Sequence, residues 1–526
     1  MFSTSAHRKI YITLLCLIVI SMTTSVFVTN LLWVLLSINW IMEWNWREKF
    51  ADFRHNYYLH AVIVLAAVHL IWMLATENIA YGFFDIQKKL PLFILPLIVF
   101  TTKPLSRYES SIIGFWYVLT ILVVSIIGLV RYLTIPDLPY RDIVPYISHI
   151  RFGLNICLAL FLLAYSAMRI PKPRFIVTNA IVALWLLFFL LMLHAYTSFV
   201  ILFITSIILL IAFGKRLSKR TRRCLSLIVL GITIGVGGLT WHYCHDYFHL
   251  KELSTQPLLA STLNGNPYTH HNDGLIENGN YVNNYICEPE LRQEWNKRST
   301  FSLDSVTSNG YTLYPALLRY LNALGVTKDS LGVTRLCESD IRAIEKGTAN
   351  PVYLQHGVRK LYYVLFFEYE SYRCYHSVCN FSMLQRIELW RNGWQIFLSH
   401  PIFGVGTGDV VDVCHQRLSD ISSPLAGTEM HTHNQYLNFL LAFGLFGFFL
   451  IAFFFIRAII TNHSCRNILF TAFLCILLIS FISEDTLETL AGITFAALGY
   501  SLLSPRKAPK KPIPRRIIKV GSINST

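Results

Sequence analysis

Charged residues are scarce in this chain of 526 residues. They make up 14% of the sequence, whereas hydrophobic residues make up 54%. Because soluble globular proteins carry about 25% charged residues, the composition excludes an ordinary soluble domain. Apolar runs of about 20 residues, the length that crosses a bilayer, recur along both ends of the chain. Backbone inside lipid must satisfy its own hydrogen bonds, so these runs predict an all-α polytopic membrane protein.

Signatures of several other chemistries are also absent from the sequence. It has no CxxC pair to suggest a zinc site and no Asp-x-Asp pair to suggest a metal-held diphosphate. We therefore predict that the protein needs no metal and no cofactor. GVGTGD at 404–409 echoes a nucleotide-binding loop, but no strand surrounds it, so we interpret it as a tight turn that aims a helix. The first apolar run lacks an evident cleavage site and is expected to be an anchor.

Acidic residues are few outside the middle of the chain, so the net charge of +15 is unevenly spread. Between Trp241 and His431 there are 15 Lys+Arg and 19 Asp+Glu, a balance of −4; the rest holds 30 basic and 11 acidic residues, a balance of +19. Short basic connections, such as KRLSKRTRR at 215–223, mark the cytoplasmic side of a membrane protein. Both termini are therefore predicted to be cytoplasmic and residues 242–433 external. Nucleic acid is not expected as a partner, whereas the basic tail could touch anionic membrane lipids.

Twelve apolar segments are candidates for membrane helices. The predicted spans are 11–28, 30–42, 58–75, 88–103, 111–131, 149–168, 175–193, 196–213, 224–241, 434–457, 467–483 and 488–504. The second and fourth are short and could be half-helices. DIQKK at 85–89 is predicted to lie outside, as a mild exception to the charge rule. The chain thus divides into an N-terminal bundle of about nine helices (1–241), a large external loop domain (242–433), C-terminal membrane helices (434–504) and a basic cytoplasmic tail (505–526).

The external segment, about 190 residues long, is too long for a simple connection. Residues 352–375 and 383–398 have helical spacing, so the segment is predicted to be a mainly helical domain. It carries six of the eleven cysteines, an even number that permits disulfides in an oxidising compartment. The pairing cannot be deduced from the sequence, although Cys374 and Cys379 are close enough for a local bridge.

One stretch joins polar residues to the start of a predicted span. Residues 431–450 read HTHNQYLNFLLAFGLFGFFL, in which His433-Asn434 is followed after nine residues by Gly444-x-x-Gly447. Upstream, RIELWRNGWQIFLSHPIFGVGTGD places an Arg and a Trp on one expected helix before Pro-x-x-Gly-x-Gly. These stretches, with a large external segment before the last three spans, resemble the bacterial O-antigen ligase family within the wider ligase and polymerase superfamily.

The resemblance implies an all-helical membrane bundle with a helical external domain, which transfers a glycan from undecaprenyl diphosphate. The acceptor would be a lipid or glycolipid of the lipid A-core type, at the outer (periplasmic) face of the bacterial inner membrane. An O-antigen or capsule polymerase, or a protein O-oligosaccharyltransferase, would use the same donor; the nine-residue spacing favours the ligase. A transporter or flippase would instead show charges or broken helices at mid-membrane depth, and a structural or signalling receptor would leave the motif inert.

His433 is the first candidate for a catalytic residue. An external enzyme has no ATP, so the energy for transfer must arrive on a preactivated donor such as a lipid-diphosphate sugar. Transfer needs a base that removes the acceptor hydroxyl proton, and histidine titrates in the useful range. We predict that His433 is this general base; the alternative is that it anchors a helix whose N-cap is Asn434. Glu429, His431 and His433 could also form a metal site, a possibility that we do not favour.

Cations are needed to hold the departing diphosphate, and arginine offers a planar fork suited to phosphate. Arg386 lies on one helical face with Trp390 and Trp394 and is the first candidate for this role. The alternative is that these residues belong to an amphipathic helix lying on the membrane. Arg391, which lies on another face, is a weaker candidate for diphosphate binding.

The family resemblance implies a further arginine near an earlier outer span end, where LHAYTSF at 193–199 has none. Arg151, which begins a span on the outer side, could substitute, because ionisable residues at membrane depth are functional candidates by default; it could also be an interfacial anchor. The carboxylates of SEDTLET at 483–489 could orient a catalytic cation or simply end a helix. Gly444 and Gly447 are interpreted as close-packing positions rather than ligand contacts.

Overall fold

The computed structural model describes residues 4–506, except 52, 137, 252–253, 255–256, 272–273, 308–311, 356, 377, 379–380 and 429–430. The chain is 74% helical. Among the described residues, the only strands are β1 (Ile276–Glu277) and β2 (Asn280–Tyr281), which pair as an antiparallel hairpin. The predicted all-α class is therefore confirmed.

The chain divides into two compact units. The bundle unit comprises Met1–Leu217, Gly393–Cys414 and Met430–Thr526; the loop unit comprises Ser218–Asn392 and His415–Glu429. These limits differ from the domain limits that the sequence predicts at 241 and 433. Helix α10 (Lys219–Phe248) groups with the loop unit because its C-terminal end packs on α16 (Val358–Tyr375), where Tyr243 stacks on Tyr362.

Helices occupy each apolar segment predicted within the bundle unit. They are α1 (Thr4–Ser21), α2 (Val26–Met42), α4 (Tyr57–Ile71), α5 (Ile79–Thr101), α6 (Arg107–Thr134), α7 (His149–Arg169), α8 (Pro173–Met192), α9 (Tyr196–Phe213), α19 (Gln435–Thr461), α20 (Ile468–Ser483) and α21 (Leu490–Leu503). Short helices between them are α3 (Trp46–Lys49), η1 (Phe53–His55), η2 (Trp72–Ala75), η3 (Tyr140–Asp142), η4 (Gly214–Arg216), η6 (Ser464–Arg466) and η7 (Thr486–Glu488). In the described part of the chain, eight helices are long and apolar enough to cross a membrane, or nine if a bent pair at α2 counts as one span. The total of about twelve spans stays a prediction.

The start of α5 differs from the sequence prediction. The sequence predicts a span at 88–103 and places 85–89 outside, whereas the helix begins at Ile79, with Asn78 as its N-cap. Asp85 and Lys89 lie inside the helix and are only 3% and 5% exposed, and the external placement of 85–89 stays a prediction. Their opposite charges pair across one helical turn, with 2.6 Å between Lys89 Nζ and Asp85 Oδ2. This pairing lets a charged segment be buried.

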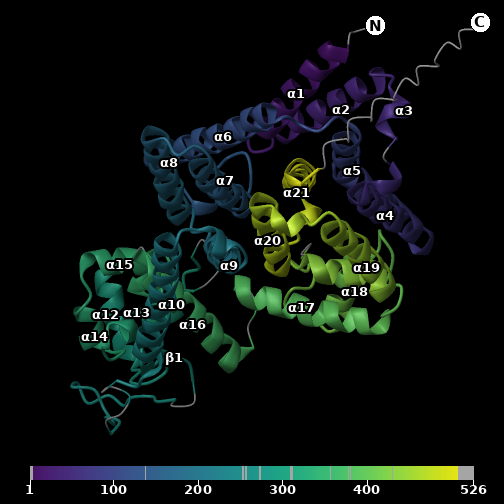
Figure 1. Cartoon of the computed structure of the whole chain (residues 1–526). Coiled ribbons are helices and arrows are strands. Elements are labelled where there is room, and N and C mark those ends of the chain that lie inside the picture. Colours follow the sequence, from purple (N-terminus) through teal and green to yellow (C-terminus); the bar gives the residue numbers. More distant parts are fainter. Residues whose placement is uncertain are drawn as a thin grey trace, which may run out of the picture. The chain divides into compact units, whose positions relative to one another are not determined.

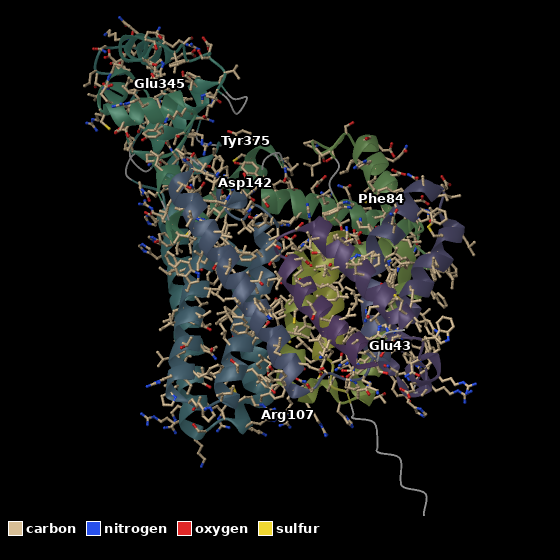
Figure 2. The ribbon with its side chains drawn as sticks, turned by 90° about the horizontal axis from the view of Figure 1, so that it is seen from above. Glu43, Phe84, Arg107, Asp142, Glu345 and Tyr375 are labelled. Atoms are coloured by element: carbon tan, nitrogen blue, oxygen red, sulfur yellow. The ribbon has the colours of Figure 1, made fainter. Side chains whose placement is uncertain are left out.

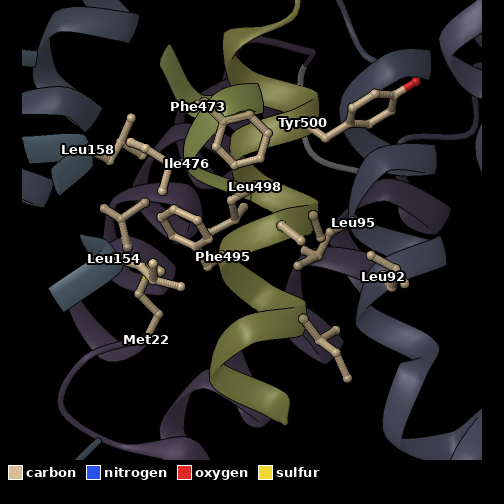
Figure 3. Packing of buried hydrophobic residues seen from close by; sticks show 14 of the residues in the cluster. Met22, Leu92, Leu95, Leu154, Leu158, Phe473, Ile476, Phe495, Leu498 and Tyr500 are labelled. Carbon is tan, nitrogen blue, oxygen red and sulfur yellow. The ribbon is translucent and has the colours of Figure 1, made fainter. Parts of the chain in front are cut away.

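Helix α21 forms part of the core of the bundle unit. Figure 3 shows Phe495 and Leu498 of α21 among side chains of α5, α7 and α20. The run from Gly492 to Ser501 is buried on every face, which explains why its sequence has no amphipathic period. In Figure 1, α21 lies beside α5 and α19 beside α4, whereas α20 lies towards α9. Figure 2 shows Glu43 and Arg107 towards one end of the bundle helices, and Phe84 and Asp142 towards the other.

Helix α19 is broken at Gly444. The backbone there is non-helical, with φ 61° and ψ −169°. The residues on either side of the break bond instead to 401–406: Leu445 N donates to Pro401 O at 2.8 Å, and Val405 N donates to Leu441 O at 2.8 Å. A Cβ on Gly444 would lie 2.3 Å from Ile402 O, so only glycine fits. The two glycine motifs seen in the sequence therefore pack against each other.

The loop unit has its own core. Helices α12 (Glu288–Arg298), α13 (Leu313–Ala323), α14 (Ser330–Thr334) and α15 (Glu338–Glu345) enclose Trp295, Leu317, Leu321 and Ile344, and η5 (Pro351–Leu354) leads to α16. The last helices before α19 are α17 (Ser382–Ser399) and α18 (Val410–Asp420), which cross the limits of the two units. Cys374 is a free thiol in the described part of the chain, and Cys379 lies outside the described residues.

Candidate functional site

His433 lies near the end of the connection that leads into α19, just before its N-cap. Asn434 is the N-cap of that helix, and its side chain accepts a hydrogen bond from Leu437 N at 3.0 Å. Thr432 donates from Oγ1 to Asn438 Oδ1 at 2.6 Å, which ties the connection to the first helical turn. His433 itself has a φ of 50°, a left-handed conformation that is uncommon for a residue with a side chain. Backbone strain of this kind clusters at functional sites, so it adds to the case for His433 as a functional candidate.

The imidazole of His433 faces a buried carboxylate. His433 Nδ1 lies 3.8 Å from Asp485 Oδ1, and the side chains are 35% and 8% exposed. The distance suits an ion pair once the imidazole is protonated, but it is too long for a hydrogen bond. Burial by itself raises the pKa of Asp485; His433 and Arg151 outweigh burial and bring this pKa well below its usual range. Asp485 therefore stays ionised beside His433.

Arg151, near the N-terminus of α7, joins the two carboxylates that follow α20. Its Nη1 donates to Glu484 at 3.2 Å, and its Nη2 donates to Asp485 Oδ1 at 3.1 Å. Nε donates to Thr489 Oγ1 at 3.1 Å. Arg151 is 5% exposed, so the ion pairs are shielded from water. Glu484 and Asp485 thus hold a guanidinium, and a catalytic role for that cation stays a prediction.

The same group of residues could accommodate a metal ion by distance alone. Ligand atoms of His433, Glu484 and Asp485 all lie within 4.8 Å of one another. Because Arg151 already donates to both carboxylates, a metal would have to displace a buried guanidinium. The alternative metal trio that the sequence raises includes Glu429, which lies outside the described residues.

Gln435, the first residue of α19, fastens the helix to the connection between α20 and α21. Its Oε1 accepts a hydrogen bond from Leu487 N at 2.8 Å, and its Nε2 donates to Glu488 Oε1 at 3.2 Å. Gln435 is fully buried. Sequence reasoning missed this residue, although an amide at the first position of an apolar span was a visible signal.

Glu488 also contacts two lysines of α5. Lys89 Nζ lies 3.1 Å from Glu488 Oε2, and Lys88 Nζ lies 3.6 Å from the same oxygen. A small pocket adjoins this cluster and is lined by Lys89, Glu488, His431 and, among others, the ring of Phe443. Sequence reasoning also missed the two lysines, because it treated DIQKK only as an exception to the charge rule.

The arginine and tryptophan candidates lie on α17. Arg386 is half-buried, and its Nη1 donates to Ser382 Oγ at 3.1 Å. Arg391 is exposed, and Trp394 is 48% exposed. Arg386, Trp390 and Arg391 belong to the loop unit, whereas His433 and Arg151 belong to the bundle unit. Within the bundle unit, the structure therefore brings together His433, Arg151 and the carboxylates of 483–489. Arg386 is part of the loop unit.

Gly447 is a packing position, as the sequence suggests. A Cβ there would lie 2.5 Å from the Cβ of Phe443 and 3.2 Å from the ring of Trp72. Such a contact leaves no room for a side chain, and no polar group is involved. Gly444, at the break in α19, also leaves no room for a side chain, but its neighbours there are the backbone groups of Ile402 and Phe403.

Comparison with known proteins identifies one region of the chain. The family model described as O-antigen ligase matches residues 361–452. This stretch covers under a fifth of the chain and contains His433, Arg386 and the paired glycine motifs. The resemblance drawn from those residues is confirmed. No curated protein matches the chain.

Proposed function

We propose, from the match of residues 361–452 to the O-antigen ligase family, that this membrane protein moves a polysaccharide from undecaprenyl diphosphate to a lipid acceptor. The match supports a glycosyltransferase of the ligase and polymerase type. The acceptor is proposed to be of the lipid A-core type, at the outer face of the bacterial inner membrane. The observation that carries the proposal is the pairing of His433 with Asp485 at the start of α19, inside the matched region.

His433 is proposed to act as the general base. Its Nδ1 faces Asp485, so the tautomer with a proton on Nδ1 leaves the Nε2 lone pair for the acceptor. Nε2 removes the proton of the acceptor hydroxyl while the hydroxyl oxygen forms a bond to the anomeric carbon of the donor sugar. The bond from that carbon to the phosphate oxygen breaks, and the diphosphate departs with the electron pair. The proton then resides on His433, beside an ionised carboxylate.

Charge favours this step. With a neutral imidazole, Arg151 and the carboxylates of Glu484 and Asp485 sum to −1. When His433 gains the proton, the sum becomes zero. Taking a group from net charge to neutrality is favourable where water is limited, because Coulomb interactions are stronger there than in bulk water. The buried pair of carboxylates on one guanidinium therefore supports a base at this position.

The departing diphosphate is proposed to bind arginine. Arg386 is the first candidate and Arg391 the second, with the face of Trp390 packing on a sugar; Asn434, Gly444 and Gly447 support the helix that presents His433. Arg151 would have to exchange a carboxylate for a phosphate oxygen before it could contribute. Arginine can hold diphosphate without an ion, so the reaction is proposed to need neither metal nor cofactor.

Other functions remain to be separated by experiment. Two features that a transporter predicts, a broken helix and buried charge, are present in α19 and α5. At the break, however, backbone groups of 441–446 bond to 401–406, so they are not left to coordinate a substrate. Cells without this protein would distinguish the family alternatives: full-length glycan on undecaprenyl diphosphate indicates a ligase, and single repeats indicate a polymerase.

The direct test is transfer by purified, monodisperse variants with a lipid-diphosphate glycan and its acceptor. General base catalysis contributes about 10²–10⁴-fold, so His433→Ala should leave a rate near background. His431→Ala is the matched control, because it removes a neighbouring imidazole that lies outside the His433-Asn434 signature, and it should be much milder. If His433→Ala retains more than about a tenth of the wild-type rate, the side chain contributes less than about 10-fold, which is below the usual contribution of a general base. The assignment would then be wrong.

A further inference from the structure

The buried charges at the start of α5 have no part in the chemistry described so far. Asp85 and Lys89 are 3% and 5% exposed, and Lys88 lies beside them. Burying charge is unfavourable, and well-packed apolar residues in place of an ion pair are often at least as stabilising. Stability alone is therefore a weak reason for a chain to carry three charged residues here. Their position relative to His433 supplies a better one.

A continuous series of contacts runs from these charges to the residue next to Asn434. Asp85 Oδ2 contacts Lys89 Nζ at 2.6 Å, and Lys89 contacts Glu488 at 3.1 Å. Glu488 accepts a hydrogen bond from the amide nitrogen of Gln435 at 3.2 Å. Gln435 is two residues from His433, and its amide oxygen accepts a hydrogen bond from Leu487 N. Every link lies within the bundle unit.

The contacts at Gln435 determine its orientation. Its amide nitrogen faces a carboxylate and its amide oxygen faces a backbone N–H, so turning the amide over would place two donors together. Glu488 is held in turn by Lys88 and Lys89, which approach the oxygen that Gln435 does not use. The connection carrying Asp485 and the connection carrying His433 are consequently fixed to each other two residues away from the imidazole.

We propose that Glu488 is a positioning residue for His433 and that Lys89 holds Glu488 in place from α5. The inference rests on the proposed function, in which His433 is the general base. The network sets the position of His433 against Asp485, and a misplacement of about 1 Å in such a site can reduce the rate about 10²-fold. Neither Glu488 nor Lys89 needs to touch the substrate for this effect.

The test compares three variants in the same transfer assay. Glu488→Gln keeps the shape and an acceptor for Gln435 but loses the charge that attracts the lysines. Lys89→Met removes the cation, and Lys89→Arg restores it. We expect kcat to fall about 10- to 100-fold in Glu488→Gln and Lys89→Met, with KM for the lipid-diphosphate glycan changed less than about threefold. Lys89→Arg should recover most of the loss.

Lys49→Met is the matched control. Lys49 is also buried, at 7% exposure, and pairs with a glutamate, Glu43, at 3.4 Å. It takes no part in the series of contacts to Gln435, so its loss should lower the melting temperature and leave kcat unchanged. Rates are divided by the amount of monodisperse protein. If Lys89→Met does not fold, Glu488→Gln, whose side chain has the same shape as the wild type, still tests the proposal.

A wild-type kcat in folded Glu488→Gln or Lys89→Met, whatever the melting temperature, would overturn the positioning role. His433→Ala in the same series separates the two proposals. If His433→Ala is inactive while Glu488→Gln has full activity, only the positioning role fails. If His433→Ala is active, the proposed general base fails first.

Discussion

Replacing Arg151 with methionine should both destabilise the bundle unit and impair transfer. The guanidinium donates to Glu484, to Asp485 and to the hydroxyl of Thr489, and the two carboxylates are only 7% and 8% exposed. Methionine fills a similar volume but donates no hydrogen bond. Two buried negative charges would then lose the cation that they share, and His433 could neutralise one of them only when it is protonated.

The expected cost follows from those contacts. Removing one partner of a buried ion pair costs about 3–5 kcal/mol, because the remaining charge stays buried without compensation. A loss of that size should lower the melting temperature by roughly 10 °C, at 2–4 °C for each kcal/mol in a large domain. Transfer should also fall, because Asp485 is no longer held where it faces His433.

A double variant makes the reasoning testable. In the Arg151→Met background, Glu484→Gln removes one of the two uncompensated charges and should restore part of the lost melting temperature. Glu484→Gln alone should be mildly destabilising, since Asp485 still pairs with Arg151. The two changes should therefore be non-additive by more than about 1 kcal/mol, as expected of groups in contact. Additive effects, or an Arg151→Met variant as stable and active as the wild type, would refute the argument.

Three further predictions concern other parts of the chain. Burial lowers the pKa of Lys328 in the loop unit to about 7, below its unfolded value of about 10.4. The protonated lysine therefore destabilises the folded loop unit, which should gain stability as pH rises from about 7 towards 10. Lys328→Met should thus raise the melting temperature relative to wild type at pH 7 more than at pH 9, and an equal difference at both pH values would contradict this. A cysteine placed at Leu263, which is 88% exposed, should react with a membrane-impermeant reagent from the periplasmic side, and labelling from the cytoplasm would reverse the predicted orientation. Transfer should continue in EDTA; activity that EDTA abolishes and magnesium or manganese restores would show a metal requirement.

Local patterns in the sequence anticipate the parts of the site that local chemistry determines. The N-cap at Asn434 and the close packing at Gly444 follow from residue type and spacing, because a cap and a glycine contact depend on a few neighbouring atoms. The helix at 383–398 follows from its period and is found as α17, Ser382–Ser399. These features need no knowledge of how distant segments come together.

The remaining features depend on partners far away in the chain. Arg151 and Glu484 are 333 positions apart, and neither residue reveals its partner in its local pattern. The extension of α5 through Asp85 and Lys89 depends only in part on a distant partner. The two residues pair with each other across one helical turn, and Glu488, from the other end of the chain, is a second partner for Lys89.

The break in α19 also bears on how this helix is made. Residues 435–461 are synthesised as one long apolar stretch, in which a glycine weakens helix by only about 1 kcal/mol. The non-helical turn at Gly444 becomes favourable when 401–406 supplies hydrogen-bond partners for the opened backbone. Membrane insertion should therefore deliver a continuous helix, and the bend should arise later, when 401–406 packs against it. Assembly of the bundle, after insertion, is the step that gives this helix its final shape.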